Sequence, residues 1–331
     1  MISVAMTTYN GCAHEGLYLR QQIDSILNQT YRDIELVICD DNSTDETCDF
    51  IQKNYCDKDS RVTLYKNEKN LGFMKNFEKA ITLCNGEFIA LSDQDDIWES
   101  WKLEESMKCL KNYDLVCSNA LIVDENAKSL GYTMKDSGGY KYVTVYQSLI
   151  FKFLMYKNFV QGATILARSE FLKKCVPIPA EYLYHDYYFA IKACLGNGLA
   201  FLDKCSVLYR HHPSQLTKNE KDSFSSELSR AVAARDKAWF DKNKKNTDEK
   251  LEFLAAVEKV PELDEKNRAY IQQYRNYLFR MLNKDFSTVL FFCKNYQAFF
   301  LDKNPAKKFI RIARRFLGVI RWKISARRQA S

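Results

Sequence analysis

Short apolar segments that alternate with helical patterns constrain this chain more than any other feature of its sequence. Four such segments begin roughly 25–30 residues apart: Ile2–Met6, Ile34–Cys39, Val62–Tyr65 and Glu87–Leu91. The apolar residues between them recur at helical spacing, so the alternation predicts βαβ units and a largely parallel sheet. Ligands bind at the carboxyl ends of the strands in such sheets. The polar residues that follow each apolar segment are therefore the first candidates for a functional site.

The segment after the fourth predicted strand reads Asp93-Gln94-Asp95-Asp96 and is followed by Ile97-Trp98. Burying an unpaired carboxylate is costly, so such a cluster favours a nearby positive charge. Short loops with several oxygen ligands suit Mg²⁺ or Mn²⁺, and these ions usually bridge a few carboxylates to the phosphates of a substrate. The pattern predicts a metal–diphosphate site, although an exposed acidic turn is the plainer alternative.

Two other polar clusters follow the first and second predicted strands. Thr8, Tyr9 and Asn10 form a loop in which the tyrosine ring can pack on a nucleotide base. Asp40 can accept the imide N–H of uracil or thymine, and the neighbouring Asp41 can reach a ribose hydroxyl. Taken alone, each cluster also fits an ordinary strand-to-helix turn with acidic residues at a helix N-terminus.

Two later segments carry residues suited to catalysis. His185-Asp186 opens a predicted helix, where Asp186 can act as a general base or simply as an N-cap. Arg210 and His212 follow a predicted strand, where arginine can neutralise phosphate charge and histidine can bind a metal or donate a hydrogen bond. A solvated basic strand end is the alternative for this pair.

The second half of the chain has a different pattern. Residues 121–128 suggest a strand and a turn, and Gln161–Arg168 and Leu199–Tyr209 suggest further strands. Ser169 is a candidate cap for a short helix, and Tyr187–Leu195 is predicted to be a helix. From about residue 219 the chain is polar and helical in pattern, and Pro261 lies within this part. We expect three parts: residues 1–215 as an α/β domain, 216–304 as a helical region, and 305–331 as a basic amphipathic tail helix.

Cysteine and histidine usage excludes several classes of protein. The chain has 11 cysteines without a C-x-x-C pair and four histidines, which argues against a zinc ribbon or a redox dithiol. Scattered cysteines fit reduced thiols in a cytosolic protein. The sequence shows no secretory signal and no apolar stretch of about 18 residues, so we expect a cytoplasmic protein without a transmembrane helix.

Positive charge is concentrated in the last part of the chain. The formal net charge is +7, yet residues 305–331 hold nine basic residues and no acidic one, and the remainder has 40 basic against 42 acidic residues. Lys307–Arg321 has one apolar and one basic helical face, which favours an anionic membrane surface as partner. A helix docked on the body or on another protein is the alternative. Nucleic acid is not expected, because the rest of the chain is not basic.

Together these segments resemble one family. Thr-Tyr-Asn after the first strand, Asp-Asp-Asn-Ser-Thr-Asp after the second, Asn70-Leu71-Gly72 before the third helix and Ser-Asp-Gln-Asp-Asp-Ile-Trp after the fourth strand resemble a family 2 glycosyltransferase with the GT-A fold, over roughly residues 1–215. The Asp-Gln-Asp-Asp-Ile-Trp form, with His-Asp before two aromatic residues, is most similar to the rhamnosyltransferase-like branch of bacterial surface-polysaccharide assembly.

The resemblance implies a role for each matching residue. It implies that Asp95 and Asp93 belong to the D-x-D metal motif, with Asp93 nearer the ribose, that Asp40 reads the base, and that Asp186 is the catalytic base. The implied nucleotide-binding residues are Thr8, Tyr9, Asn10, Asp40, Asp41, Asn70, Gly72 and Asp93. Possible phosphate or acceptor contacts are Asp96, Trp98, His185, Arg210 and His212. The chain departs from the family at His185, where glutamate is usual, and at Pro213-Ser214-Gln215.

The implied reaction is an inverting single displacement in the hexosyltransferase class. A sugar would move from a nucleotide-diphosphate donor, dTDP-rhamnose or UDP-hexose, to a hydroxyl of a glycan or of a polyprenyl-diphosphate-linked acceptor at the inner face of the cell membrane. A divalent metal would stabilise the leaving diphosphate. Two rival functions are a nucleotidyltransferase, disfavoured by the absence of a basic glycine-rich loop in residues 7–11, and a non-catalytic glycan-binding protein, disfavoured by Asp93, Asp95 and Asp186.

Overall fold

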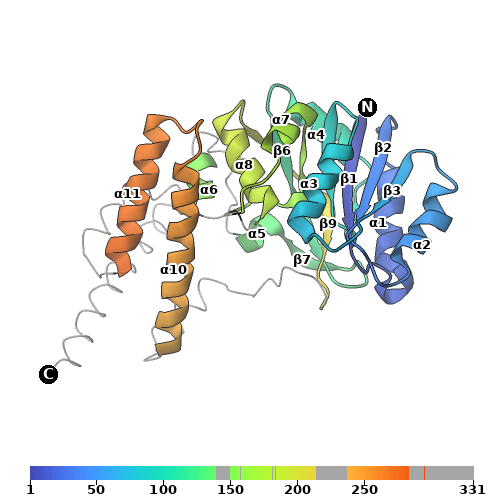
Figure 1. The fold of residues 1–331 in the computed structure, drawn as a ribbon, viewed down its shortest axis with the longest axis horizontal. Helices are drawn as coiled ribbons and strands as arrows, with labels where there is room; N and C mark the ends of the chain where they lie inside the picture. The colour runs from blue at the N-terminus through green and yellow to red at the C-terminus, as the bar shows by residue number, and fades with distance from the viewer. Residues whose placement is uncertain are drawn as a thin grey trace. The chain divides into compact units, whose positions relative to one another are not determined.

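The computed structural model describes residues 1–138, 150–156, 158–180, 182, 184–213, 237–282 and 294. The chain divides into two compact units (Figure 1): residues 1–138 with 159–216, and residues 139–158 with 217–331. The sequence placed the first domain edge between residues 215 and 216. Residues 139–158, expected inside the first domain, group with the second unit. The predicted tail helix, residues 305–331, lies outside the described residues.

The first unit is built on one mixed sheet. Its strands are β1 (Ile2–Thr8), β2 (Ile34–Asp40), β3 (Val62–Lys66), β4 (Phe88–Ser92), β5 (Ile97–Trp98), β6 (Leu115–Val123), β7 (Ser129–Thr133), β8 (Leu166–Arg168) and β9 (Leu199–Arg210). Their order is β3-β2-β1-β4-β8-β6-β9-β5, and β7 pairs with β6. The first four strands run parallel, as the sequence predicts. β8 runs antiparallel to both β4 and β6, whereas β6 and β9 are parallel.

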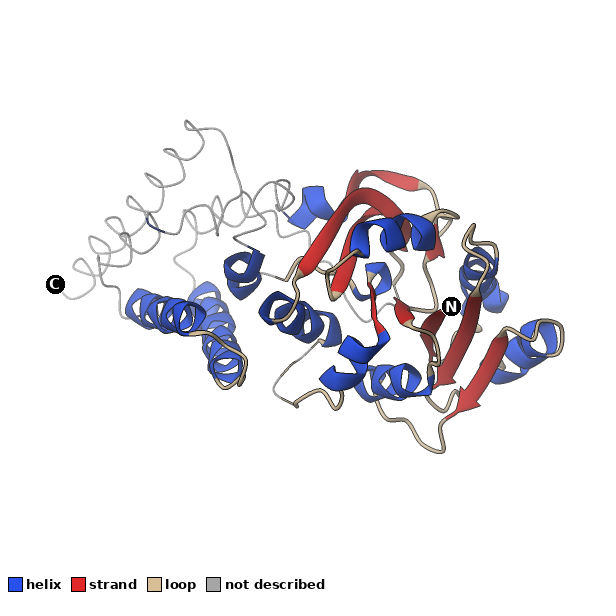
Figure 2. Ribbon diagram, turned by 90° about the horizontal axis from the view of Figure 1, so that it is seen from above, coloured by secondary structure: helices blue, strands red, loops and turns tan. Residues whose placement is uncertain are grey.

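Helices cover both faces of this sheet. They are α1 (Leu17–Leu27), α2 (Thr47–Ile51), α3 (Phe73–Leu83), α4 (Lys102–Leu110), α5 (Met134–Gly138), α7 (Ser169–Cys175) and α8 (His185–Leu195). Right-handed crossovers place α1 and α2 on one face and α3 on the other, because β4 returns to the far side of β1. Along that second face, α7 lies between α3 and α8 and contacts both of them (Figures 1 and 2).

Two segments differ from their predictions. The strand predicted over Gln161–Arg168 is a 3-10 turn at Gly162–Thr164 followed by the short β8. Ser169 is the first residue of α7, and Arg168 occupies the N-cap position. The strand and turn predicted over residues 121–128 are present as the end of β6 and the turn into β7. There the Asp124 carboxylate accepts hydrogen bonds from the backbone N–H groups of Asn126 and Lys128, both at 2.9 Å.

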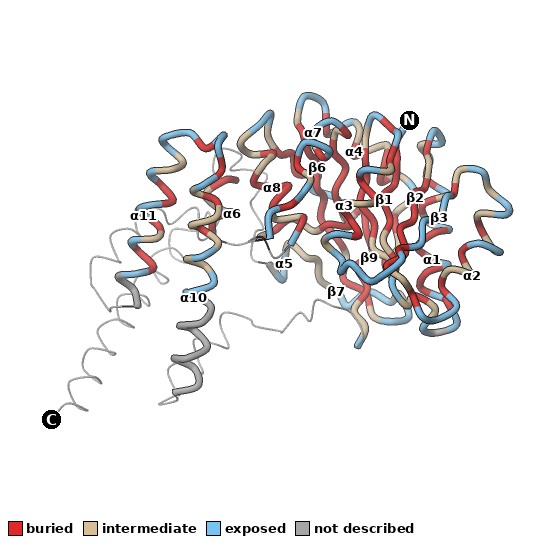
Figure 3. Tube along the Cα trace, in the orientation of Figure 1, coloured by how far each residue is buried: buried red, intermediate tan, exposed pale blue. Residues whose placement is uncertain are grey.

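The core lies on both sides of the parallel strands (Figure 3). Val4, Leu36, Ile38 and Ile89 are fully buried. Strands covered by helices on both faces are apolar at nearly every position, which explains the continuous apolar runs in the sequence. Burying each such side chain contributes about 1.5–3 kcal/mol relative to leaving it exposed.

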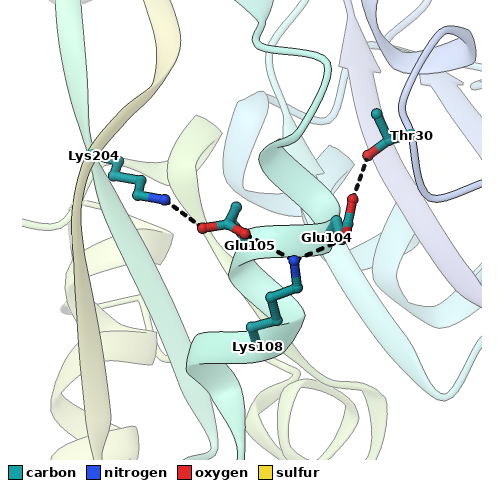
Figure 4. Close-up of polar contacts among 5 residues, drawn as sticks. All are labelled: Thr30, Glu104, Glu105, Lys108 and Lys204. Carbon is teal, nitrogen blue, oxygen red and sulfur yellow. Dashed lines mark hydrogen bonds and ion pairs between the residues drawn. The ribbon is translucent and has the colours of Figure 1, made fainter.

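Helix α4 is also tied to its surroundings by a surface polar cluster (Figure 4). Glu105 pairs with Lys108 on the same helix and with Lys204 on β9. The Thr30 hydroxyl donates to Glu104 at 2.9 Å, which joins α4 to the loop after α1. Exposed ion pairs contribute little to stability. We therefore assign this cluster to the orientation of α4 and not to the site described below.

The second unit is helical where the structure describes it. It contains α6 (Ile150–Tyr156), α10 (Lys237–Glu258) and α11 (Glu265–Leu282). Tyr270, Tyr274 and Tyr277 recur at helical spacing on α11 and are buried. Pro261 lies in the turn between α10 and α11, where proline breaks no helical hydrogen bond. None of the described helices combines the length and the apolar character needed to cross a bilayer.

Candidate active site

The carboxyl ends of β1, β2 and β4 align at one edge of the sheet. Thr8 pairs in register with Asp40 of β2, and Met6 pairs with Ser92 of β4. The loops that leave these strands therefore start at neighbouring positions, and the loop after β4 begins with Asp93. The three polar clusters that the sequence singled out meet at the edge where ligands bind in sheets of this kind.

Asp40 is completely buried at the end of β2 and is held by three donors. Its carboxylate accepts hydrogen bonds from the Thr8 hydroxyl at 2.9 Å, from the Ser43 backbone N–H at 2.7 Å and from the Ser43 hydroxyl. These bonds join the first two loops of the site. Direct reading of a base by Asp40 stays a prediction, which the complete burial of this residue does not support.

Asp41 organises the loop that leads into α3. Its carboxylate accepts hydrogen bonds from the backbone N–H groups of Leu71 at 2.7 Å and Gly72 at 2.9 Å, and from the Asn67 amide at 2.9 Å. The Asn70 amide donates to the Asp41 carbonyl at 3.2 Å. Gly72 has φ +81°, a backbone conformation that favours glycine. Asp41, Asn70 and Gly72, predicted to bind nucleotide, thus shape one loop together.

The loop after β1 is fixed by Gln94, to which the sequence analysis gave no role. The Gln94 amide accepts a hydrogen bond from the Tyr9 N–H at 2.9 Å and donates one to the Tyr9 carbonyl at 3.1 Å. A Cβ at Gly11 would lie 2.9 Å from Gln94 Oε1, so a larger residue there would displace the Gln94 amide from its place beside Tyr9. Asn10 accepts a hydrogen bond from the Thr44 N–H at 2.9 Å. The Tyr9 side chain is 47% exposed, as stacking on a base requires.

Three carboxylates from two distant parts of the chain lie close enough to interact. Burial and the negative charges of Asp95 and Asp186 raise the pKa of Asp93 to about 7. Asp186 is the second residue of α8, where the helix dipole favours an anion. A Cβ at Gly162 would lie 3.9 Å from the Asp186 Cβ, so the turn before β8 also borders this residue. The fold thus brings the predicted metal motif and the predicted base into one electrostatic cluster.

The end of β9 completes the loop after β4. His212 Nε2 lies 2.9 Å from Asp95 Oδ2. The Arg210 guanidinium donates to the Asp95 carbonyl at 2.8 Å, to the Glu125 carbonyl at 2.7 Å and to Gln21 Oε1 at 2.6 Å. Arg210 is only 2% exposed. Its contacts indicate that it holds the loop in place, and a direct phosphate contact by Arg210 stays a prediction.

Asp96 and Trp98 point into the protein. Asp96 Oδ1 accepts the backbone N–H of Arg210 at 3.0 Å, and both Asp96 and Trp98 are buried. The fully buried Lys102 places its ammonium group 3.7 Å from the centroid of the Trp98 ring. Contacts of Asp96 and Trp98 with phosphate or acceptor stay predictions, which this inward orientation does not support. The sequence analysis missed Lys102, because a lysine at a helix start ordinarily faces solvent.

His185 is enclosed by aromatic rings beside Asp186. Its ring centroid lies 4.1 Å from that of Phe77 and 6.3 Å from that of Phe73. Burial lowers the pKa of the His185 imidazole to about 3, so the ring is neutral at physiological pH. A Cβ at Gly162 would lie 2.8 Å from His185 Nε2. A phosphate contact by His185, one of the sequence predictions, therefore lacks a positive charge to support it.

The chemistry of the residues at this edge fits a divalent cation. Asp93 and Asp95 offer carboxylate oxygens, and burial together with the charges of Asp95 and Asp186 raises the pKa of Asp93, as expected of a carboxyl group that has no cation beside it. Among the described residues, no three donor side chains form a closed metal site. Mg²⁺ and similar ions are often held by one or two carboxylates, with phosphate oxygens and water completing the shell. The donor set is compatible with that mode of binding.

Comparisons with known proteins agree with this geometry. The family model described as glycosyl transferase family 2 matches residues 3–176. An uncharacterised glycosyltransferase of Methanocaldococcus jannaschii is 31% identical over 204 residues, which cover 61% of this chain and 67% of that protein. The UDP-Glc:alpha-D-GlcNAc-diphosphoundecaprenol beta-1,3-glucosyltransferase WfaP of Escherichia coli is 36% identical over 107 residues, which cover 32% of this chain and 40% of that protein.

A solved structure shares the fold. Residues 1–349 of TarS from S. aureus, in complex with UDP-GlcNAc, align with a TM-score of 0.56 and 19% sequence identity, covering 90% of this chain and 78% of that one. At this identity the likeness concerns the fold alone. The sheet, its polar edge and the family match define a glycosyltransferase with the GT-A fold. The chain belongs to glycosyl transferase family 2.

Proposed function

We propose that this glycosyltransferase moves a sugar, with inversion, from a nucleotide-diphosphate donor to a hydroxyl of a glycan or lipid-linked oligosaccharide in bacterial surface-polysaccharide synthesis. The observation that carries the proposal is the interaction of Asp93 with both Asp95 and Asp186. A glycosyl transfer of this kind would use carboxylates that hold a divalent ion at the leaving diphosphate and a separate carboxylate as base at the attacking hydroxyl. This cluster supplies both from separate elements.

Asp186 is the proposed catalytic base. It would accept the proton of the acceptor hydroxyl while that oxygen bonds to the anomeric carbon and the nucleotide diphosphate leaves from the opposite face. A positioned general base contributes roughly 10²–10⁴-fold to such a rate. No covalent enzyme intermediate is needed, because a single displacement inverts the anomeric configuration.

Asp93 and Asp95 are the proposed ligands of Mg²⁺ or Mn²⁺, and His212 is a further candidate because it contacts Asp95 at 2.9 Å. A bound divalent ion stabilises the charge that develops on the leaving diphosphate. Arg210 supports this arrangement, since its guanidinium donates to the Asp95 carbonyl and its backbone N–H donates to the Asp96 carboxylate. Asp95 therefore has little freedom to move when the donor binds.

The nucleotide would occupy the edge formed by the first three loops. Tyr9 offers an exposed ring for the base, next to Thr8 and Asn10. Asp40 and Asp41 shape the pocket through their hydrogen bonds, together with Asn70 and Gly72. A uracil or thymine base is proposed, hence UDP-hexose or dTDP-rhamnose as the donor. TarS has been crystallised with UDP-GlcNAc, which is in line with a uridine donor here.

The acceptor is proposed to be lipid-linked. WfaP, which resembles part of this chain, is named for a GlcNAc-diphosphoundecaprenol acceptor. The nine basic residues in 305–331 would bring the enzyme to anionic lipid at the cytoplasmic face, where such acceptors are built. A peripheral cytoplasmic enzyme of the rhamnosyltransferase-like branch is therefore the proposal for its place in the cell.

Donor binding and turnover test this function directly. The full chain is screened by thermal shift against UDP- and dTDP-sugars with and without Mn²⁺, and each stabilising donor is then incubated to measure nucleotide release to water. We expect at least one sugar nucleotide to stabilise the protein in a Mn²⁺-dependent manner and to be hydrolysed slowly. If no UDP- or dTDP-sugar stabilises or is hydrolysed with metal present, the proposed donor class is wrong.

A further inference from the structure

Two exposed aromatic side chains lie beside the proposed catalytic base. Phe73 is the first residue of α3, and Tyr184 directly precedes α8, which carries Asp186 in its first turn. Their ring centroids are 6.4 Å apart, and the ring planes differ by 37°. Phe73 is 38% exposed and Tyr184 46% exposed. Adjoining exposed apolar side chains that form one patch often mark a binding site.

The aromatic pair stands on a packed support. The His185 ring contacts Phe73 and stacks against Phe77, which is 1% exposed. Phe189, one helical turn further along α8, meets the His185 ring edge-to-face with a centroid distance of 6.0 Å. These contacts join the starts of α3 and α8. The exposed rings of Phe73 and Tyr184 are therefore supported by packed side chains beneath them.

The support also contains an unsatisfied polar group. His185 is buried, with only 7% of its surface exposed, yet neither Nδ1 nor Nε2 has a hydrogen-bond partner among the described residues. Buried polar atoms are nearly always hydrogen-bonded, so the exceptions call for an explanation. Nε2 faces the turn at Gly162, where an added Cβ would lie 2.8 Å away, so the imidazole marks a tightly packed junction between this turn and the starts of α3 and α8.

We propose that Phe73 and Tyr184 form a platform for the acceptor sugar whose hydroxyl attacks, an inference that rests on the proposed function. A pyranose ring has an apolar face of C–H groups that packs on an aromatic ring, while its hydroxyl groups point outward along the edge. Tyr184 precedes Asp186 by two residues, so a sugar on this platform places its edge near the base. The platform thereby orients the nucleophile.

The charge of the neighbouring residues favours a neutral sugar over the phosphate of a lipid carrier. Asp93 interacts with both Asp95 and Asp186, and Asp186 follows Tyr184 of the platform by two residues. With Asp93 and Asp95 engaged by the donor's metal ion, the Asp186 carboxylate would still repel a second phosphate placed there, whereas it would not repel a neutral pyranose. The lipid diphosphate of the acceptor would therefore lie beyond the platform, away from the carboxylate cluster.

Saturation-transfer NMR tests the platform with simple sugars as probes. The full chain with UDP and Mn²⁺ is mixed with millimolar methyl glycosides of glucose, N-acetylglucosamine and rhamnose. We expect saturation to reach the C–H protons of at least one glycoside. In Phe73→Leu and Tyr184→Leu the affinity should fall about three- to tenfold, the size expected for losing an aromatic contact. Tyr184→Phe should keep it.

Phe279→Leu is the matched control, because Phe279 on α11 is 62% exposed and belongs to the other unit. Donor hydrolysis to water is measured on every variant. Retained hydrolysis with weakened sugar binding in the two platform variants supports the inference. If no glycoside binds the wild type, or if all variants bind equally, the platform is wrong. Loss of hydrolysis in the platform variants with unchanged sugar binding also overturns it. Failure of wild-type hydrolysis counts against the proposed function instead.

Discussion

The side-chain amide of Gln94 makes two hydrogen bonds to the backbone of Tyr9, one to its N–H at 2.9 Å and one to its carbonyl at 3.1 Å. Gln94 stands between Asp93 and Asp95, so this pairing couples the proposed metal loop to the proposed base-stacking residue. The two loops follow different strands, and these bonds fix the position of one relative to the other. Positioning of Tyr9 should therefore depend on Gln94.

We expect Gln94→Met to weaken binding of UDP with Mn²⁺ by about tenfold. Methionine keeps the length of the side chain but loses both hydrogen bonds, each worth about 0.5–1.5 kcal/mol net. A change of 1.4 kcal/mol corresponds to about tenfold in affinity. Isothermal titration calorimetry measures it. Gln52→Met is the matched control, since Gln52 bonds to the exposed Asp57. Equal affinity in wild type and Gln94→Met would contradict the coupling.

The parallel half of the fold was predictable from sequence for a physical reason. Strands covered on both faces need apolar residues at nearly every position, and Ile34–Asp40 and Phe88–Ser92 show this directly. The family resemblance was confirmed, and so was the GT-A fold. The short β8 was predicted as a longer strand, because three residues of antiparallel pairing depend on tertiary neighbours and leave no periodic pattern of their own.

The arrangement of the site was only partly predictable. The sequence singled out Asp93, Asp95 and Asp186, whose proximity the structure adds. It gave no sign that His185 would be buried against Phe77, because the two residues are far apart in the chain. The role of Gln94 was not predicted for another reason. Its hydrogen-bond partner, the Tyr9 backbone, lies 85 residues earlier in the chain, so the sequence gives no sign of the contact.

Asp95→Ala should abolish the Mn²⁺-dependent part of nucleotide-diphosphate binding. A divalent ion and a diphosphate share their charge in a site only where a carboxylate anchors the ion. The measurement is UDP affinity with Mn²⁺ and with chelator, and the wild type should show a difference that the variant lacks. Asp57→Ala, at an exposed carboxylate that bonds to Gln52, serves as control. Wild-type affinity in the variant, or full activity with chelator, would refute this role.

Asp186→Asn should leave donor binding near normal and lower transfer by roughly 10²–10⁴-fold, the usual contribution of a general base. The amide keeps the shape of the side chain and cannot accept the proton. Donor affinity and single-turnover transfer are measured on the same preparation, so that binding and chemistry are separated. Transfer within a few-fold of wild type would show that another residue is the base.

Deletion of residues 305–331 should release the protein from anionic membranes while sparing donor binding. The segment holds nine basic residues and no acidic one. Each basic residue near an anionic surface contributes about 1 kcal/mol, and the attraction is screened by salt. Co-sedimentation with phosphatidylserine vesicles at low and high salt compares the two forms. If both forms pellet equally, or if pelleting does not change with salt concentration, the segment does not bind membranes electrostatically and instead packs on the protein.

The buried Lys102, which interacts with Asp96, makes the stability of the protein depend on pH. Burial lowers the pKa of the Lys102 ammonium from its ordinary value of 10.5 to about 7, while the Asp96 charge opposes the shift. Between pH 7 and 10.5 the unfolded chain holds this proton and the folded protein does not. Raising the pH across this window therefore favours folding, and the contribution of Lys102 to stability is lost as the pH falls toward 7.

Lys102→Met should remove this dependence and raise the free energy of unfolding at pH 7. Replacing a buried charge by an apolar side chain of similar length often stabilises by about 1–4 kcal/mol. The gain should shrink at pH 9.5, where the wild type no longer bears the full cost of the buried ammonium. Urea unfolding at both pH values measures it, with the exposed Lys108→Met as control. A loss of stability at pH 7 that exceeds the control would show instead that Lys102 acts chiefly as the charged partner of Asp96.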